Sequence, residues 1–165
     1  MKGIFSCIVG GMRRRPFPLR HVTVLALLLL PGMQADAGEM LAGPIIAEPL
    51  RVIDGDTVSV RVRVWLDLDM TVDIRIRGID TPERRGACAE EKALARMATE
   101  HLAALALPGP LRLTRIEHDK YAGRIVADVV TGDGTDIAAL MRSSGLARAY
   151  DGKARPGWCG LAALE

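Results

Sequence analysis

The sequence contains few histidines and few aromatic residues. Its 165 residues include three histidines, and aromatic residues make up 4% of the chain. His101 lies in a predicted helix, and His118 lies in a polar stretch where we interpret it as an exposed loop residue. Histidine therefore offers no catalytic mechanism here. The scarcity of aromatic side chains leaves little surface on which long single-stranded nucleic acids could stack.

The sequence also lacks a hydrophobic run long enough to span a bilayer. The apolar run at residues 22–30 has about nine residues, well short of the roughly 20 that a spanning helix needs. Arginines precede this run, and Ala35 and Ala37 after it offer small residues at the positions that a signal peptidase reads. We therefore predict a cleavable signal peptide over residues 1–37 and export to the periplasm or out of the cell. An uncleaved anchor is the alternative.

The chain has no net positive charge once this leader is removed. The leader holds five of the 22 Lys and Arg residues and one of the 20 Asp and Glu residues, so the remaining chain has a net charge of −2. A polyanionic substrate would have to be held by individual arginines and a bound cation rather than by the field of the whole domain.

The sequence has three cysteines, and two of them remain once the predicted leader is removed. Cys7 leaves with the leader, and Cys88 and Cys159 remain in a compartment that permits disulfides. A bridge between them would close a loop of about 70 residues and contribute roughly 4 kcal/mol by the chain-entropy model. We expect this disulfide, and the alternative is two unrelated buried thiols.

Hydrophobic periodicity predicts an α+β chain that is mainly β. Apolar residues alternate over 58–64 and again over 70–76, which predicts two half-buried strands joined by a turn at 67–69. The second strand should carry Arg75 on its outer face, with its apolar residues, Met70 included, facing the core. Residues 111–116 and 125–130 predict two further strands. Several short strands with few helices indicate a small barrel capped by helices.

Two helices are predicted. The first covers residues 89–106 with an apolar stripe that includes Met97 and Leu102, while Glu90 and Glu91 form a solvated face. The second follows a turn at 131–134, with Thr135 or Asp136 as its N-cap.

Four short motifs contain the residues of a phosphodiester-cleaving site. They are Asp54-Gly55-Asp56-Thr57, Arg75, Asp80-Thr81-Pro82-Glu83 and Asp119-Lys120-Tyr121-Ala122-Gly123-Arg124. Carboxylate and carbonyl oxygens suit Ca²⁺ or Mg²⁺, a spare glutamate can take a proton from water, and two guanidiniums can bind a phosphate as charge develops on it. Each motif has an ordinary reading when taken alone, as a turn, a helix N-terminus or an exposed charge. Their combination favours the catalytic interpretation.

In their order and spacing, these motifs resemble the signature of the staphylococcal nuclease (thermonuclease) family. The resemblance runs from about Val52 to Tyr150. It implies a five-stranded OB-fold barrel capped by helices over residues 51–160, after a short N-terminal extension at 38–50 and before a tail at 161–165. It also implies Ca²⁺-dependent hydrolysis of DNA and RNA, without sugar specificity, to 3′-phosphate products.

The resemblance also implies roles for individual residues. Asp56, Asp80 and the carbonyl of Thr81 would hold Ca²⁺ with Asp54 in support, and Glu83 would activate water. Arg75 and Arg124 would bind the phosphate. Lys120, Tyr121 and Tyr150 would contact the substrate, although the two tyrosines could equally be packing residues. The loop before Arg124 is one residue longer than the family pattern, so the position of this arginine depends on how the loop accommodates the extra residue.

The simplest expectation is a monomer with nucleic acid as its substrate and no stable protein partner. A catalytically inactive module of the cell envelope that binds nucleic acid or protein is the alternative. The presence of Arg75, Glu83 and Arg124 argues against that alternative.

Overall fold

A computed structural model describes residues 39–121 and 123–160. The predicted signal peptide with its cleavage site after Ala37, and the predicted tail at 161–165, lie outside the described residues. Among the described residues, no helix is both long and apolar enough to cross a membrane.

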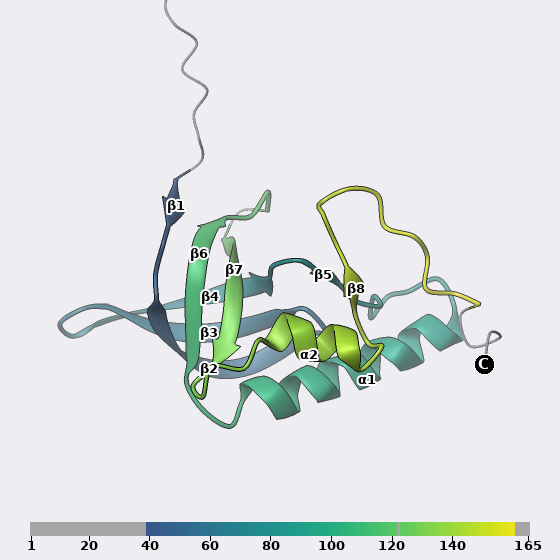
Figure 1. Cartoon of the computed structure of the whole chain (residues 1–165), viewed down its shortest axis with the longest axis horizontal. Coiled ribbons are helices and arrows are strands. Elements are labelled where there is room, and N and C mark those ends of the chain that lie inside the picture. The colour runs from purple at the N-terminus through teal and green to yellow at the C-terminus, as the bar shows by residue number, and fades with distance from the viewer. Residues whose placement is uncertain (1–38, 122, 161–165) are drawn as a thin grey trace, which may run out of the picture. The chain divides into compact units, whose positions relative to one another are not determined.

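The described chain forms a closed five-stranded barrel with two helices, which confirms the predicted OB-fold (Figure 1). The strands are β1 (Met40–Leu41), β2 (Ile45–Asp54), β3 (Thr57–Trp65), β4 (Leu68–Ile76), β5 (Ile79–Asp80), β6 (Leu111–His118), β7 (Arg124–Thr131) and β8 (Arg148–Ala149). The barrel order is β2-β3-β4-β7-β6, and β6 pairs again with β2 to close it. β4 and β7 pair in parallel, with Arg75 opposite Val126, and the other pairs are antiparallel.

The barrel begins earlier in the sequence than the motifs indicate. β2 starts at Ile45, inside the segment expected to be an extension, and Ala47 is fully buried against the core. Pro49 conceals this strand from pattern analysis, because proline is normally confined to edges and irregular positions of a sheet. The register of β2 against β3 shifts just after Pro49, as a bulge would produce. We therefore propose a domain boundary before Ile45.

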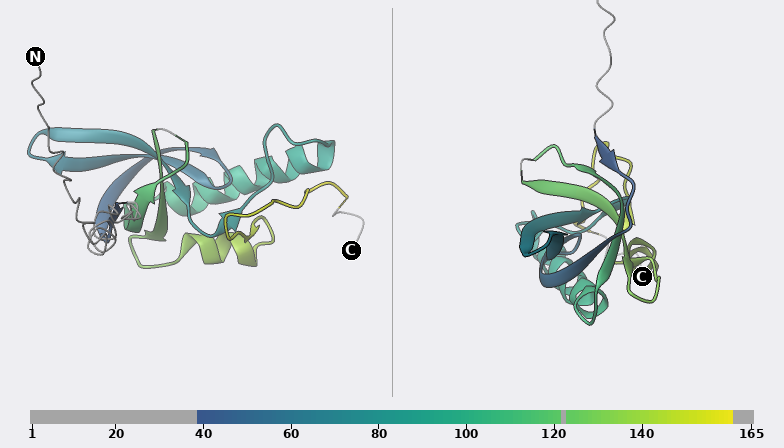
Figure 2. Two further views of the ribbon diagram at one scale, coloured as in Figure 1. Left: turned by 90° about the horizontal axis from the view of Figure 1, so that it is seen from above. Right: turned by 90° about the vertical axis from the view of Figure 1, so that its left-hand side faces the viewer.

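The hairpin of β3 and β4 extends past the barrel, so its outer end has no core to face (Figure 2). Ile74 and Ile76 are buried as predicted, but Met70 is 50% exposed. The predicted turn is displaced: β4 begins at Leu68, and the chain reverses just before it, with Asp67 at φ 59°. Alternation by itself does not show where a strand leaves the core.

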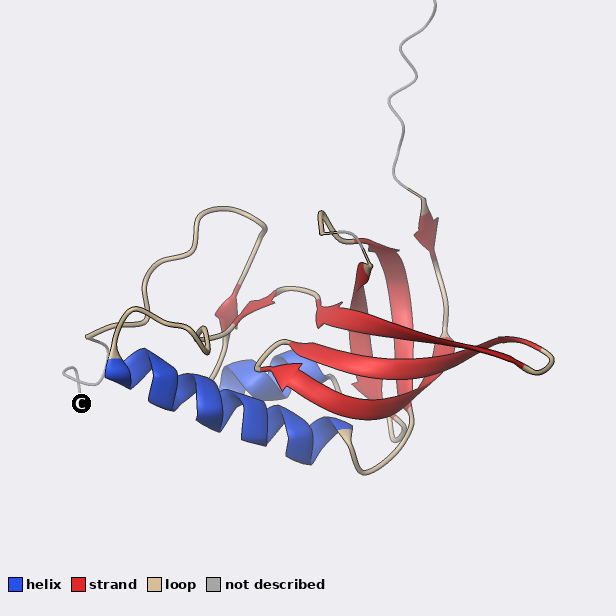
Figure 3. Ribbon diagram, turned by 180° about the vertical axis from the view of Figure 1, so that it is seen from behind, coloured by secondary structure: helices blue, strands red, loops and turns tan. Residues whose placement is uncertain are grey.

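Both helices lie on one side of the barrel (Figure 3). The long helix α1 (Ala89–Ala106) has the predicted bounds, but Met97 is 53% exposed and the helix packs chiefly through Ala95, Ala98 and Leu102. Alanines let the helix approach the barrel closely, so the larger Met97 is turned outward. The second helix, α2 (Ile137–Ser143), has Asp136 as its N-cap, whose Oδ1 accepts from the amide of Ala139.

A second, two-stranded sheet brings the C-terminal part of the chain to the site. Gly78 adopts φ 78°, a left-handed conformation that turns the chain from β4 into β5. β5 then pairs antiparallel with β8, with Asp80 opposite Arg148. The segment after β8 therefore starts beside a candidate metal ligand.

Candidate functional site

One cavity of about 210 Å³ gathers most of the predicted site residues. They come from five separate parts of the sequence: the β2–β3 turn, the end of β4, the loop after β5, the β6–β7 loop with the start of β7, and the segment after β8. The lining residues are Asp54, Asp56, Arg75, Thr81, Pro82, Glu83, Tyr121, Arg124 and Arg155. Apart from Arg155 and Pro82, each of them was assigned a role from the sequence.

The β2–β3 turn is packed tightly against its neighbours. Asp54 Oδ1 accepts from the amide of Asp56 at 3.1 Å. A Cβ atom on Gly55 would lie 2.8 Å from both Ala98 Cβ and Thr81 Oγ1. A glycine is required here because α1 and Thr81 leave no room for a side chain. This contact sets the position of the two aspartates relative to the loop after β5.

Asp56 is a buried carboxylate with an arginine partner. Its side chain is 5% exposed, and its Oδ2 lies 2.5 Å from Arg75 Nη1. Thr57 Oγ1 donates to its Oδ1 at 2.8 Å. Burial raises the pKa of Asp56 to about 6; the Arg75 charge opposes this rise and the Asp54 charge adds to it. A cation bound here would therefore compete with a proton.

Arg75 lies on the face of β4 opposite the core residues Ile74 and Ile76, as predicted, but that face is covered and the side chain lines the cavity. Its side chain is only 11% exposed. Arg75 Nη2 donates to the carbonyl of Ile79 at 3.1 Å, and the guanidinium carbon lies 5.8 Å from the centre of the Tyr150 ring. Two-residue periodicity shows which face Arg75 occupies, but it does not show that β5 and β8 cover that face.

Asp80 does not line the cavity but is buried next to Arg155, which does, and its set of hydrogen-bond partners is incomplete. The residue is 3% exposed, and Trp158 Nε1 donates to its Oδ2 at 3.1 Å. Its Oδ1 lies 3.1 Å from Arg155 Nε but forms no hydrogen bond. A buried carboxylate oxygen without a hydrogen bond is an unusual and costly group, and it is a suitable ligand for a cation.

Glu83 projects from the loop after β5 toward solvent, with its side chain 61% exposed. Arg155 Nη1 donates to Glu83 Oε1 at 2.6 Å. The amide of Glu83 donates to Glu91 Oε1 at 3.4 Å, and the amide of Ala87 donates to Glu91 Oε2 at 2.9 Å. The predicted solvated position of Glu91 is thus wrong: the residue is 7% exposed, because its carboxylate accepts from backbone amides of this loop.

The loop between β6 and β7 places Arg124 in the cavity despite its extra residue. Arg124 Nε donates to Asp119 Oδ2 at 2.5 Å, and the backbone amide of Asp119 donates to the carbonyl of Arg124 at 3.0 Å. The Arg124 guanidinium lies 5.0 Å from the Tyr121 ring, and Lys120 Nζ lies 5.2 Å from the same ring. Residue 122 lies outside the described residues.

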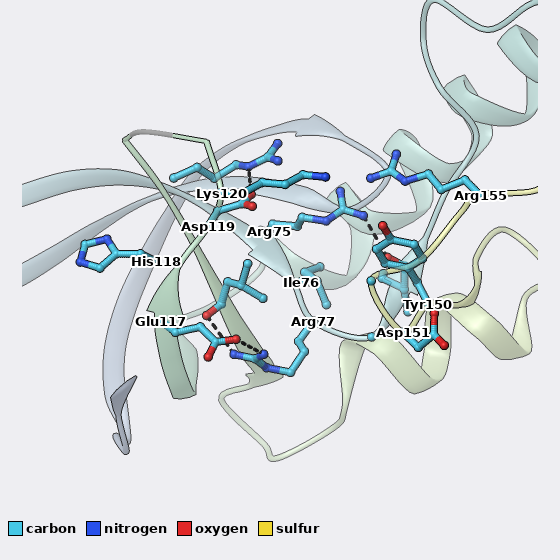
Figure 4. Close-up of a pocket in the computed structure, with 15 residues that line it drawn as sticks. Arg75, Ile76, Arg77, Glu117, His118, Asp119, Lys120, Tyr150, Asp151 and Arg155 are labelled. Atoms are coloured by element: carbon cyan, nitrogen blue, oxygen red, sulfur yellow. Dashed lines mark hydrogen bonds and ion pairs between the residues drawn. The ribbon is translucent and has the colours of Figure 1, made fainter. Parts of the chain in front are cut away.

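A second cavity of about 440 Å³ adjoins the first and shares its three arginines, Arg75, Arg124 and Arg155. Lys120 and Tyr150 line this second cavity, while Tyr121 lines the first. Figure 4 shows Arg75, Tyr150 and Arg155 near one another at one end of this second cavity. The predicted substrate-contacting residues therefore divide between two connected spaces.

The donor set around the first cavity fits a hard divalent cation. Asp54 and Asp56 line the cavity with carboxylate oxygens, and the buried Asp80, which does not line it, has an oxygen whose hydrogen-bond capacity is unfilled. Among residues 39–121 and 123–160, the one close group of three potential ligand side chains is Cys88, Glu91 and Cys159. That group does not suit calcium, because its two sulfurs are bonded to each other at 2.17 Å.

The predicted disulfide between Cys88 and Cys159 is present, with Cα atoms 6.0 Å apart. Cys88 is the N-cap of α1, and its Sγ accepts from the amide of Glu91 at 3.4 Å. The bridge therefore fastens the C-terminal segment to the helix end that follows the Glu83 loop. The alternative of two unrelated thiols is wrong.

Three residues that contact the predicted site were missed in the sequence. Arg155 and Trp158 contact Asp80, and Glu91 holds the Glu83 loop. Arg155 lies in a stretch with neither helical nor strand periodicity, so no local pattern marks it. The one available signal was the position of Trp158 beside a cysteine expected to form a disulfide.

Comparison with known proteins identifies the domain. The sequence profile of the family described as staphylococcal nuclease homologue matches residues 73–157, slightly more than half of the chain. The match begins within β4 and includes Arg75, Glu83 and Arg124, while Asp54 and Asp56 precede it. No curated protein sequence matches the chain significantly.

Proposed function

The chain belongs to the staphylococcal nuclease homologue family, and from this premise we propose that it is an exported, Ca²⁺-dependent nuclease. Its substrates would be DNA and RNA, cleaved without sugar specificity to give 3′-phosphate products. The observation that carries the proposal is the gathering of Arg75, Glu83 and Arg124 in one cavity with two aspartates. The disulfide and the predicted leader support export, because disulfides persist outside the reducing cytosol.

The acidic residues would have two different roles, metal binding and proton transfer. Asp56, Asp80 and the carbonyl of Thr81 would hold Ca²⁺, with Asp54 in support. Bound calcium would supply Lewis-acid stabilisation and a fixed position for the phosphate. Glu83 is the carboxylate most open to solvent in this group, and it would accept a proton from the attacking water.

The arginines would bind the phosphate. A phosphodiester carries negative charge that grows as water attacks, and a rigid guanidinium fork matches the phosphate oxygens. Arg75 and Arg124 line the same cavity, each held by an aspartate that keeps its position before substrate arrives. Lys120, Tyr121 and Tyr150 would contact the rest of the substrate from the two cavities.

The test is the release of acid-soluble nucleotides from heat-denatured DNA and from RNA by the purified protein, in Ca²⁺ and in chelator. We expect calcium-dependent release that falls by about a hundredfold or more in Glu83→Gln, because the variant loses its proton acceptor. Glu90→Gln is the matched control: it removes a carboxylate from an exposed position of α1 and should leave the rate unchanged.

The chemistry of the products gives a second readout. Products that phosphatase treatment converts to free 3′-hydroxyls would confirm cleavage toward 3′-phosphates. A folded, disulfide-bonded protein that releases nothing from either substrate would contradict the proposal and favour the inactive binding module.

A further inference from the structure

Arg155 contributes a third guanidinium to the space that holds Arg75 and Arg124. It lines both cavities, and its side chain is 32% exposed. Arg155 Nη1 lies 2.6 Å from Glu83 Oε1, and Arg155 Nε lies 3.1 Å from Asp80 Oδ1. Its guanidinium is also 5.2 Å from the ring of Tyr150, which Arg75 approaches from 5.8 Å. Arg155 thus contacts both a proposed metal ligand and the proposed base.

The segment that carries Arg155, residues 150–159, is fixed at both ends. At its start, the amide of Tyr150 donates to the carbonyl of Gly78 at 3.0 Å. At its end, Cys159 is bonded to Cys88, and the buried Trp158 lies under the guanidinium of Arg148, 3.5 Å from the ring centre. These contacts keep Arg155 near the cavity, whereas an arginine on an unanchored loop would have no fixed position.

The charges around Arg155 indicate why it rests where it does. Asp56, Asp80 and Glu83 each have an arginine partner, and Arg75 pairs with the first of them. Arg155 balances the other two. Its pairing with Asp80 lacks hydrogen-bond geometry, and Glu83 is largely exposed, so neither contact holds the guanidinium strongly.

We propose that Arg155 is a further phosphate-binding residue, an inference that rests on the proposed nuclease function. In the free protein its guanidinium balances Asp80 and Glu83. With a cation at the aspartates and substrate in the cavity, it transfers to a non-bridging oxygen of the phosphate beside Arg75 and Arg124. A guanidinium fork can bind a phosphate through two nitrogens, so this exchange replaces one hydrogen bond to Glu83 and a non-hydrogen-bonded contact with Asp80 by a better-matched partner. The same exchange frees Glu83 to accept a proton.

The direct test is phosphate affinity, measured by calorimetry in Ca²⁺ with deoxyadenosine 5′-monophosphate and with deoxyadenosine as the phosphate-free probe. We expect Arg155→Ala to weaken nucleotide binding by about tenfold to a hundredfold, the range for hydrogen bonds to charged groups, without changing nucleoside binding. Arg155→Lys should lie between the wild type and this variant, because an ammonium keeps the charge and loses the fork.

Lys153→Ala is the matched control. Lys153 is on the same segment, its side chain is 83% exposed, and it lines neither cavity; its partner Asp151 lines the second cavity but not the first. Removing its charge should change nucleotide affinity by less than about twofold if local contact, rather than net charge, explains the effect of Arg155. Equal losses in Lys153→Ala and Arg155→Ala would overturn the assignment.

Other outcomes separate this inference from the function on which it rests. Nucleotide binding by Arg155→Ala that equals wild-type binding would overturn the inference, and tighter binding would overturn it and show that Arg155 obstructs the site. If the wild-type protein hydrolyses nucleic acid and Arg155→Ala keeps its KM and affinity, the inference alone fails. If nothing is hydrolysed but nucleotide affinity falls in Arg155→Ala, the nuclease fails and Arg155 remains a phosphate ligand. Should the alanine variant not fold, Arg155→Lys decides by the same measurement.

Discussion

The two parts of the site are held together by different means. Asp54 and Arg75 lie on the barrel at the ends of β2 and β4, and Asp56 lies in the turn between the paired strands β2 and β3. Arg155 and Trp158 lie on a segment without helix or strand after β8, held by a disulfide and a buried tryptophan. The barrel part gets its geometry from backbone hydrogen bonds, and the C-terminal part gets its geometry from a few side chains. The second part is therefore the one that can be released without unfolding the first.

Removing the disulfide is the strongest way to break this comparison. We expect Cys88→Ser/Cys159→Ser to lose roughly 4 kcal/mol of unfolding free energy, the value for a loop of about 70 residues. Serine is also a good N-cap for α1, so the loss of unfolding free energy measures the effect of removing the disulfide and not of weakening the helix N-terminus. Denaturant unfolding with and without reductant measures it. An unchanged midpoint would show that the bridge does not stabilise the fold, whereas retained far-UV dichroism at low temperature would show that the barrel survives.

The barrel part is tested by Arg75→Ala. Removing a donor aimed at developing charge costs about a hundredfold or more in kcat, so we expect a loss of this size. Arg61→Ala is a suitable control, because Arg61 lies on neighbouring β3 and pairs with Glu48 at an exposed position. Steady-state rates on a short oligonucleotide distinguish the two. Similar activity in both variants would remove Arg75 from the proposed mechanism.

The pH dependence of stability tests whether the pKa of Asp56 is raised in the folded protein. Its pKa is raised from 3.8 to about 6 in the folded protein, so the folded state binds this proton more tightly than the unfolded state. Its contribution to stability is therefore complete below about pH 3.8 and is lost as pH rises through about 6. In chelator, we expect the difference in unfolding free energy between wild type and Asp56→Asn to fall by on the order of 3 kcal/mol across that window. A difference that does not vary with pH would show that Asp56 titrates normally.

The smallest expected effect concerns the junction between the two parts. Glu91→Ala removes the acceptor for the amides of Glu83 and Ala87, and we expect it to cost about 1 kcal/mol of stability. We also expect a lower kcat with little change in KM, because the Glu83 loop loses its position relative to the cavity. Glu90→Ala, one residue away and exposed, is the control. Equal effects of the two variants would assign Glu91 to helix stability alone.

Much of the barrel was predictable because local periodicity reports local structure. The bounds of α1, the strands at 57–65 and 124–131, and the turn before Asp56 follow from alternation, helical spacing and turn residues. The β2 strand was not predictable in full, since Pro49 and a bulge interrupt its pattern. The exposure of Met70 and Met97 was not predictable either, because it depends on where a strand leaves the core and on how closely a helix approaches it.

For the site, the residue types and their order in the chain were enough to assign the family and the proposed catalytic residues, because metal and phosphate chemistry permits few side chains at each position. Contacts between distant segments decided the rest. Three features depend on contacts between residues that are far apart in sequence. They are the burial of Arg75 beneath β5 and β8, the hydrogen bond between Asp80 and Trp158, and the position of Arg155. No local pattern encodes these contacts, since each exists only after the barrel closes and the disulfide holds the C-terminal segment against it.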